Sequence, residues 1–237
     1  MKIEVLYPEF GNLFGDISNI TYLKKCLPEA DIIETSINQT PSFVSQDVNM
    51  IYLGPSTEKQ QEIIISKLQP YKDRIMELIE KNVVFLFTGN SLEILGKYIE
   101  NEDKSKVECL GIFDVYAKRD MLHRKNSNII GKYEDIEIVG FKSQFTMMYG
   151  DNSEQYFTKL ETGMGINKDT NLEGIKKNNF IGTYIIGPIL ILNPLFTKKI
   201  IKMMGVEEPK LAFEKDVMSA YEARLKEFHE KFEAKNE

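Results

Sequence analysis

Apolar runs of strand length alternate with longer segments of helical periodicity in the first half of the chain. Runs at residues 2–8, 31–37, 50–54 and 83–87 predict four strands. The last run is almost continuously apolar, which is typical of a central parallel strand that is covered on both faces. The alternation of strands and helices predicts an open, mostly parallel sheet with right-handed crossovers.

Two segments between these strands have apolar residues at helical spacing. They are Asn19–Leu27 and Thr57–Lys81, and Pro70 is expected to divide the second segment into two helices. Ligands of open parallel sheets bind beyond the carboxyl ends of the strands. Gly54 and Gly89, each of which ends a predicted strand, are therefore the positions where a site is expected.

The second half of the chain carries fewer helical signals. Short segments at 109–117, 129–133, 136–145 and 155–160 predict strands at regular spacing, and the apolar run at 180–192 predicts another buried strand. The expected fold class is therefore α/β, with a mostly parallel sheet flanked by helices and extra antiparallel strands in the second half.

The tail of the chain has apolar residues three or four positions apart, from Val217 to Phe232. This spacing predicts an amphipathic helix at about 211–234, and packing on its own domain is favoured over a partner-binding role. Neither an internal repeat nor a convincing linker divides the chain. Residues 1–237 are therefore expected to form a single domain.

Composition and charge narrow the class of protein. Hydrophobic residues make up 42% of the chain and charged residues 28%, as in soluble globular proteins. The net charge of −6, with lysines spread along the chain, disfavours a nucleic-acid partner. No apolar run approaches the roughly 20 residues of a membrane span. Two cysteines, Cys26 and Cys109, without a C-x-x-C motif, indicate reduced, buried thiols and a cytoplasmic location.

The segment FLFTGNSLEILG, residues 85–96, predicts a strand, a tight turn and a helix. Enzymes such as α/β hydrolases place their nucleophile at such an elbow. Here the turn holds Gly89, Asn90 and Ser91, and Asn90 or Ser91 is expected to cap the following helix.

Ser91 is the weak candidate nucleophile of this elbow. A serine at its ordinary pKa is a poor nucleophile without a base, and the two histidines, His123 and His229, lie in a polar loop and on the terminal helix. An active hydrolase that uses Ser91 with Glu93 or another carboxylate stays an alternative. Distant histidines and isolated carboxylates lack metal-ligand spacing, so neither a metal nor a cofactor is expected.

Five segments follow one another in a pattern that belongs to a known family. They are LYPEFGNLFGDISNITYLKKCL, IYLGPSTEKQQ, GNSLEILG, LGIFDVYAKR and LEGIKKNNFIGTYIIGPILILNP. In this combination the chain resembles class I glutamine amidotransferases of the cobyric-acid-synthase (CobB/CobQ) type. Within that class it is similar to the glutaminase subunits of lipid II isoglutaminyl synthases. The resemblance implies a Mur-ligase-like partner that receives ammonia and amidates peptidoglycan precursors of the cell wall.

The resemblance also implies catalytic groups that this chain lacks. These enzymes use a Cys nucleophile, a His base and backbone N–H donors that hold the oxyanion. Aligned on the shared segments, the nucleophile position falls on Gly89 and the histidine position on Ile186. The segment that supplies the oxyanion donors in these enzymes corresponds to Gly54-Pro55-Ser56 in this chain. Pro55 has no N–H to donate.

The favoured interpretation is therefore a degenerate, non-catalytic amidotransferase-like protein, a binding or regulatory subunit of a Mur-ligase-like partner. Its remnant pocket is expected to hold a small ligand that is more apolar than glutamine. The resemblance adds Arg124 or Arg119 as a ligand-positioning residue, although a solvated loop is the favoured interpretation of this basic stretch. An active glutaminase with an unassigned nucleophile is the remaining alternative. The pocket candidates are Gly54, Pro55, Ser56, Gly89, Asn90, Ser91, Arg124 and Ile186.

Overall fold

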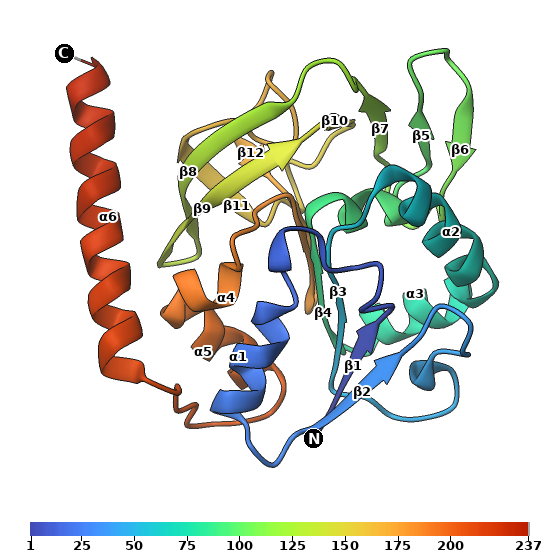
Figure 1. Ribbon diagram of the computed structural model, residues 1–237, viewed down its shortest axis with the longest axis horizontal. Helices are drawn as coiled ribbons and strands as arrows, with labels where there is room; N and C mark the ends of the chain where they lie inside the picture. The colour runs from blue at the N-terminus through green and yellow to red at the C-terminus, as the bar shows by residue number, and fades with distance from the viewer. Residues whose placement is uncertain (237) are drawn as a thin grey trace.

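A six-stranded sheet with the strand order β13-β14-β4-β3-β1-β2 forms the centre of the molecule (Figure 1). The computed structural model describes residues 1–236, with side chains described through Phe232. β13 pairs with β14 in antiparallel fashion and the other neighbours are parallel, which confirms the mostly parallel sheet. The strands are β1 (Lys2–Leu6), β2 (Asp31–Thr35), β3 (Met50–Leu53), β4 (Val84–Thr88), β13 (Ile175–Lys177) and β14 (Phe180–Thr183).

Helices cover both faces of this sheet, so that the core has three layers (Figure 1). One face carries α2 (Glu58–Leu68) and α3 (Lys72–Glu80). The other face carries α1 (Ser18–Cys26), α4 (Ile189–Leu192) and α5 (Pro194–Met203).

The apolar run of β4 explains how both faces are buried. Phe85 and Phe87 pack in the cluster with α2 and α3, whereas Val84 and Leu86 pack in the cluster with α1, α4 and α5. Successive side chains of a strand point to opposite faces of a sheet. A strand that is apolar throughout therefore contributes to two cores, as the sequence predicted.

The helical segment between β3 and β4 begins and divides where local chemistry predicts. The Thr57 hydroxyl accepts a hydrogen bond from the N–H of Gln60, and the Gln60 side chain accepts one from the Thr57 N–H, which makes a capping box for α2. The short 3₁₀ helix η3 (Gln69–Tyr71) separates α2 from α3 at Pro70.

Two smaller sheets make up most of the second half, with the orders β10-β7-β5-β6 and β12-β11-β8-β9. β8 and β9 form a long antiparallel hairpin, in register from Lys125↔Gln144 to Tyr133↔Ile136. The strands are β5 (Tyr98–Glu100), β6 (Lys106–Glu108), β7 (Tyr116–Arg119), β8 (Lys125–Tyr133), β9 (Ile136–Gln144), β10 (Thr146–Tyr149), β11 (Thr158–Thr162) and β12 (Leu172–Glu173).

Two of the predicted strands are wrong in extent. The apolar run at 180–192 is not one strand: β14 ends at Thr183, and α4 begins after Gly187-Pro188. Both parts are buried, and an apolar run alone does not distinguish a buried strand from a buried helix. Residues 109–115 form a loop, and only Tyr116–Arg119 pairs as β7.

The terminal helix α6 spans Glu214–Asn236 and lies along the β8–β9 hairpin (Figure 1). Tyr221, Leu225 and Phe228 pack against Ile130 and Val139 of that hairpin. The Tyr221 hydroxyl donates a hydrogen bond to a backbone carbonyl of β9 at 2.8 Å. The apolar stripe of α6 is therefore occupied by its own chain.

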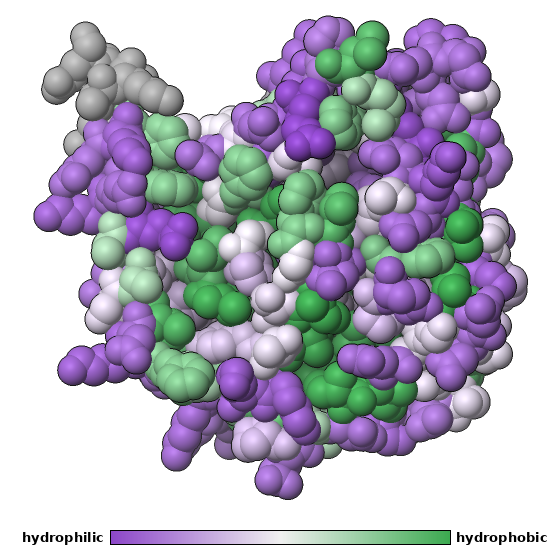
Figure 2. Space-filling model, viewed as in Figure 1, coloured by the Kyte–Doolittle hydropathy of each residue, from purple (hydrophilic) through white to green (hydrophobic). Residues whose placement is uncertain are grey.

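The outer surface is mixed in character. On the face shown in Figure 2, apolar residues gather toward the middle and hydrophilic residues surround them. Within residues 1–236, no helix has the length and apolar character that crossing a membrane requires.

Candidate functional site

A cavity of about 230 Å³ lies beyond the carboxyl ends of β3 and β4. Its walls come from the loop after β3, the elbow after β4, the end of β9 and the segment after β14. Six of the eight candidate pocket residues line it, although they lie far apart in the sequence. These are Pro55, Ser56, Gly89, Asn90, Arg124 and Ile186.

Gly89 has a backbone conformation and a neighbour that both disfavour a side chain. Its φ is +60°, in the left-handed region that glycine tolerates best. A Cβ built on Gly89 would lie 2.6 Å from the Cβ of Pro55. The elbow therefore has the sharp bend of a nucleophile position, with the ring of Pro55 where the side chain would begin.

Gly54 and Ser91 are the two candidates that do not line the cavity. Gly54 faces Gly11, whose carbonyl oxygen would lie 2.1 Å from an added Cβ. The Ser91 hydroxyl is buried, 2.7 Å from the carbonyl oxygen of Thr88 and 2.9 Å from that of Leu53. Gly54 thus permits a close backbone contact, and Ser91 ties the elbow to β3.

Asn90 joins the two loops that form the cavity wall. Its Oδ1 accepts a hydrogen bond from the Ser56 N–H at 3.0 Å, and its Nδ2 donates one to the Ser56 carbonyl oxygen at 2.9 Å. The predicted capping role of Asn90 or Ser91 is wrong. The 3₁₀ helix η4 (Gly89–Leu95) has Thr88 as its N-cap residue, without a side-chain cap.

Ile186 lines the cavity from the segment after β14. Its backbone forms an isolated bridge with Phe141, with the Ile186 N–H donating to the Phe141 carbonyl oxygen at 2.9 Å. The Ile186 side chain is buried and apolar, so it cannot accept a proton. Both histidines have other partners: the His123 ring lies 2.7 Å from Asp120, and the His229 ring lies 2.9 Å from Glu137.

Asp16 is a buried carboxyl that sequence reasoning did not single out. Its Oδ2 accepts hydrogen bonds from the Tyr52 hydroxyl at 2.6 Å and from the Thr88 hydroxyl. Burial raises the pKa of Asp16 above its usual range. The nearby Asn19 side chain accepts a hydrogen bond from the Leu190 N–H at 2.9 Å. These contacts connect β3, β4 and α4 beneath the elbow. The sequence pairs Gly15-Asp16 and Asn19-Ile20 of the opening segment could have pointed to Asp16 and Asn19.

Glu93 is a second buried carboxyl, and it lines the cavity. The Tyr184 hydroxyl donates to its Oε1 at 2.9 Å, and Gln61 Nε2 donates to its Oε2 at 2.8 Å. Burial outweighs these hydrogen bonds and raises the pKa of Glu93 to about 7. Sequence reasoning considered Glu93 only as a partner for Ser91.

The two candidate arginines have different surroundings. Arg124 is exposed and lines the cavity, with its guanidinium carbon 4.6 Å from the centre of the Phe145 ring. Among the described side chains it forms no ion pair. Arg119 does not line this cavity: its guanidinium bonds Glu62 at 2.6 Å and Gln61 at 2.9 Å. Arg124 is therefore the arginine that is open to a ligand.

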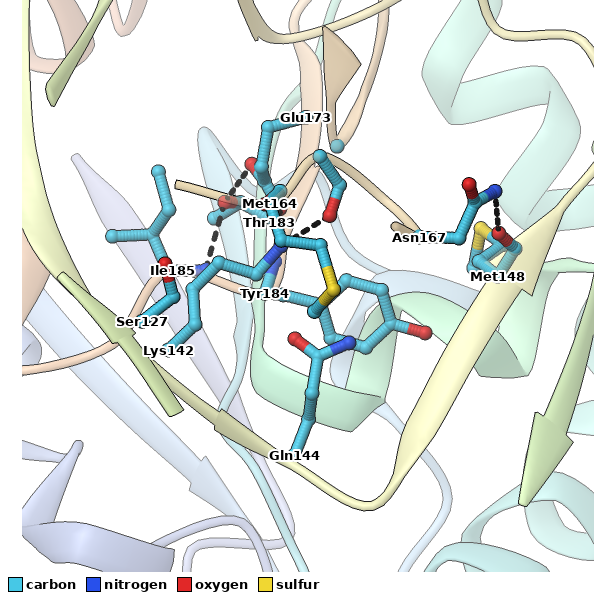
Figure 3. Close-up of polar contacts among 12 residues, drawn as sticks. Ser127, Lys142, Gln144, Met148, Met164, Asn167, Glu173, Thr183, Tyr184 and Ile185 are labelled. Carbon is cyan, nitrogen blue, oxygen red and sulfur yellow. Dashed lines mark hydrogen bonds and ion pairs between the residues drawn. The ribbon is translucent and has the colours of Figure 1, made fainter. Parts of the chain in front are cut away.

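A buried ion pair supports the wall that carries Tyr184 (Figure 3). Lys142 Nζ lies 3.6 Å from Glu173 Oε1, and both side chains are fully buried. Lys142 also donates to the carbonyl oxygen of Met164 at 2.8 Å. Glu173 accepts hydrogen bonds from the Thr183 hydroxyl at 2.7 Å and from the Tyr184 N–H at 2.9 Å. The pair thus links β9 and β12 to the end of β14.

Gln144 contributes an unpaired acceptor to the cavity wall (Figure 3). Its Nε2 donates to the Thr146 carbonyl oxygen at 2.6 Å, which fixes the orientation of the amide. Its buried Oε1 has no hydrogen-bond partner among the described residues. Unpaired buried acceptors are uncommon in proteins, so this oxygen marks a place for a donor.

Metal-ligating groups and the two cysteines are the remaining candidates for a reactive site. Within the described residues, no group of three His, Cys, Asp or Glu side chains is placed to hold a metal ion. Cys109 is buried and burial raises the pKa of its thiol to about 12, while burial also raises the pKa of the half-buried Cys26. Thiols with raised pKa values are poor nucleophiles at neutral pH.

Two curated proteins are similar to this chain in sequence. The lipid II isoglutaminyl synthase (glutamine-hydrolyzing) subunit GatD of Staphylococcus aureus (strain N315) is 29% identical over 187 residues, 77% of this chain and 75% of that protein. The subunit of the same name from Streptococcus pneumoniae (strain ATCC BAA-255 / R6) is 25% identical over 232 residues, 92% of this chain and 87% of that protein.

The fold and the family follow from two further matches. A crystal structure of a glutamine amidotransferase superposes with a TM-score of 0.58 at 12% identity, covering 86% of this chain and 99% of that one, and so shares the fold. The family model of the CobB/CobQ-like glutamine amidotransferase domain matches residues 2–193, which is most of the chain. This protein therefore belongs to the CobB/CobQ-like glutamine amidotransferase family.

Proposed function

We propose that this protein is a non-catalytic member of its family, which keeps the amidotransferase pocket but does not hydrolyse glutamine. The relationship between Gly89 and Pro55 carries the proposal. The nucleophile position has no side chain, and the space where one would begin is occupied by a proline ring. Ile186, at the histidine position, supports the proposal because it offers no base.

The protein would act as a binding or regulatory subunit. Both curated relatives are named as subunits of a lipid II isoglutaminyl synthase, which supports a role beside a ligase subunit. We infer a Mur-ligase-like partner in the cytoplasm and a role in cell-wall synthesis. The cavity would then serve to bind a small ligand rather than to transform it, with Arg124 at its open side.

The competing function is a hydrolase that uses Ser91. The Ser91 hydroxyl is buried and lies against two backbone carbonyl oxygens, outside the lining of the cavity. A nucleophile needs a base within hydrogen-bond reach and access to its substrate. These contacts favour a structural role for Ser91, and the non-catalytic proposal is the stronger of the two.

Ammonia release from L-glutamine tests the proposal. The purified protein is assayed alone and with a co-expressed Mur-ligase-like subunit, and the Staphylococcus aureus relative, named as glutamine-hydrolysing, is the positive control. We expect no release above the buffer rate in either case, together with co-purification of the two subunits. Glutamine-dependent turnover that scales with protein concentration would overturn the proposal.

A further inference from the structure

The outer side of β2 has backbone groups that no described part of the chain pairs with. β2 is the last strand of the central sheet, and the view of Figure 1 has this edge in front. The Asp31 N–H and the Thr35 carbonyl oxygen bond the chain at the two ends of β1, at 2.8 and 2.7 Å. Because alternate residues of an edge strand bond its neighbour, the N–H and C=O groups of Ile32 and Glu34 point away from β1.

An open groove lies beside these backbone groups, between β2 and α1. Its volume is about 410 Å³, and on the same face of the molecule Figure 2 shows apolar residues gathered toward the middle. The groove is lined by Ile17, Ile20, Thr21, Lys24, Lys25, Ile32 and Glu34. Free backbone groups next to an apolar groove are the features to which an added strand binds.

The charged side chains of the groove lie at opposite ends of β2. Lys24 Nζ donates to the Pro28 carbonyl oxygen at 2.8 Å, shortly before β2 begins, and Lys25 Nζ lies 6.0 Å from the centre of the Phe213 ring. Glu34 is exposed near the end of the strand. None of these three charged side chains forms an ion pair within the described residues. The start of β2 is therefore flanked by cations, and its end carries a carboxylate.

We propose that two copies of this chain associate by antiparallel pairing of their β2 strands, about a twofold axis at Ile33. In this register Ile32 of each copy opposes Glu34 of the other. The outward N–H and C=O groups of both copies then hydrogen-bond one another, so the two central sheets become continuous.

The charges of the groove favour a second copy over an unrelated strand. The antiparallel register carries Glu34 of one copy to the start of the other copy's β2, where Lys24 and Lys25 have no carboxylate partner. Symmetry repeats this contact, so both copies gain an ion pair. Asp31 opposes Thr35 in the same register, and no like charges face each other across the strands. An unrelated peptide would have to supply an acidic residue at this position, whereas β2 supplies it itself.

Sedimentation equilibrium of the full chain measures the association. We expect a reversible monomer–dimer equilibrium with a dissociation constant of about 100 µM or tighter, as for a small interface. The measurement does not depend on ammonia release, so the inference and the proposed function fail or stand separately.

Charge reversal tests the register. Glu34→Lys and Lys25→Glu each create two like-charge contacts in a homodimer, and each should weaken association at least about tenfold. An equimolar mixture of the two variants should restore association, because their heterodimer has opposite charges at both contacts. Glu108→Lys, on the exposed edge strand β6, is a control with the same change in charge and should leave the dissociation constant unchanged.

A proline at the edge tests the backbone pairing. Ile32→Pro removes an outward N–H and no hydrogen bond to β1, whereas Ile32→Ala shortens the side chain and keeps that N–H. We expect association to be at least about tenfold weaker in Ile32→Pro than in Ile32→Ala. Thermal unfolding checks that each variant is folded.

Several results would overturn the inference. They are a chain that stays monomeric at about 1 mM, an unchanged dissociation constant in Glu34→Lys, and a mixture of the two charge variants that associates no better than either variant alone. A dimer that keeps its full affinity in Ile32→Pro would use another surface and would equally refute the β2 pairing.

Discussion

The Cβ of Pro55 lies 2.6 Å from the position that a Cβ on Gly89 would take. Real Cβ atoms do not approach other carbon atoms so closely, so a side chain at residue 89 requires the loop after β3 to move. The two positions lie 34 residues apart in the chain and belong to different loops. Under the proposed function, the absence of a nucleophilic side chain and the occupation of its space by Pro55 are thus one structural feature.

Gly89→Ala should destabilise the fold more than a glycine-to-alanine change at a similar φ. Gly15 is the matched control, because its φ is +71° and nothing lies within 4 Å of an added Cβ. We expect Gly15→Ala to cost about 1–2 kcal/mol from backbone strain, and Gly89→Ala to cost a further 1–3 kcal/mol or so from overpacking. Urea unfolding measures both values.

Pro55 is the expected source of the additional cost. In a Pro55→Gly background, Gly89→Ala should cost about as much as Gly15→Ala, because the Cβ and Cγ atoms that it would meet are gone. If the additional cost of Gly89→Ala persisted in that background, the proline ring would not be the obstacle.

Restoring the nucleophile and the base should not restore catalysis. Gly89→Cys with Ile186→His places the missing groups, but Pro55 crowds the new side chain and has no N–H for an oxyanion. Loss of one oxyanion donor typically costs about 100- to 1,000-fold in rate. We expect ammonia release from the double variant at the buffer rate, and measurable release only after Pro55→Gly is added. Robust turnover by the double variant would contradict this account of Pro55.

Ser91→Ala should act on stability alone. The change removes the buried hydroxyl that bonds the carbonyl oxygens of Thr88 and Leu53, and we expect a loss of about 1 kcal/mol in the free energy of unfolding. A fluorophosphonate probe should label the wild-type protein no more than the variant. Selective labelling of the wild type at Ser91 would support the hydrolase.

Glu93 should make stability fall as the pH rises. Its pKa is about 7 when folded, above the value of 4.5 for an ordinary glutamate, so the folded state holds a proton that the unfolded state has lost between these values. Stability therefore decreases from about pH 4.5 to pH 7 and then levels off, by about 3 kcal/mol in total. The charged and titratable groups that face Glu93 are Glu58, Cys109, Arg119 and Tyr184.

Glu93→Gln isolates this contribution. Because the other titrating groups are shared, we expect the variant to match the wild type near pH 5 and to exceed its stability at pH 8. Chemical denaturation at the two pH values measures the difference. A constant difference between the two proteins at both values would show that the Glu93 carboxyl does not titrate with a raised pKa.

Substitutions of Lys142 and Glu173 should have non-additive effects on the free energy of unfolding. Lys142→Met leaves the buried Glu173 without its cation and is expected to cost about 3–5 kcal/mol, whereas adding Glu173→Gln should recover part of that loss. The exposed pair of Lys132 and Glu161, 3.4 Å apart, is the control, and its removal should cost less than about 1 kcal/mol. Strict additivity of the two buried substitutions would contradict the coupling.

Sequence reasoning predicted the central sheet well because its signal is strong and local. A run such as 83–87, apolar on both faces, is compatible with few environments in an α/β protein. The run at 180–192 was misassigned because a buried strand such as β14 and a buried helix such as α4 both consist of apolar residues. β5 and β6 were missed because they are three residues long and partly polar.

The site was predicted only in part, for a different reason. Gly89 was predicted from its place at the end of a strand, whereas Pro55 and Ile186 came from a resemblance, since no spacing rule brings residues of separate loops together. Glu93 and Gln144 were not recognised as cavity residues, because burial of a polar side chain depends on tertiary packing rather than on local pattern.

The contacts beneath the elbow have a consequence for how this family can change. Asp16, Thr88 and Ser91 hold the bend through hydrogen bonds in which neither Gly89 nor Ile186 takes part. A change from a nucleophile to glycine and from a base to isoleucine leaves these hydrogen bonds intact, so loss of the reaction need not endanger the fold. In evolutionary terms, a lineage that abandons one chemistry in this way keeps a stable scaffold, on which selection can establish another.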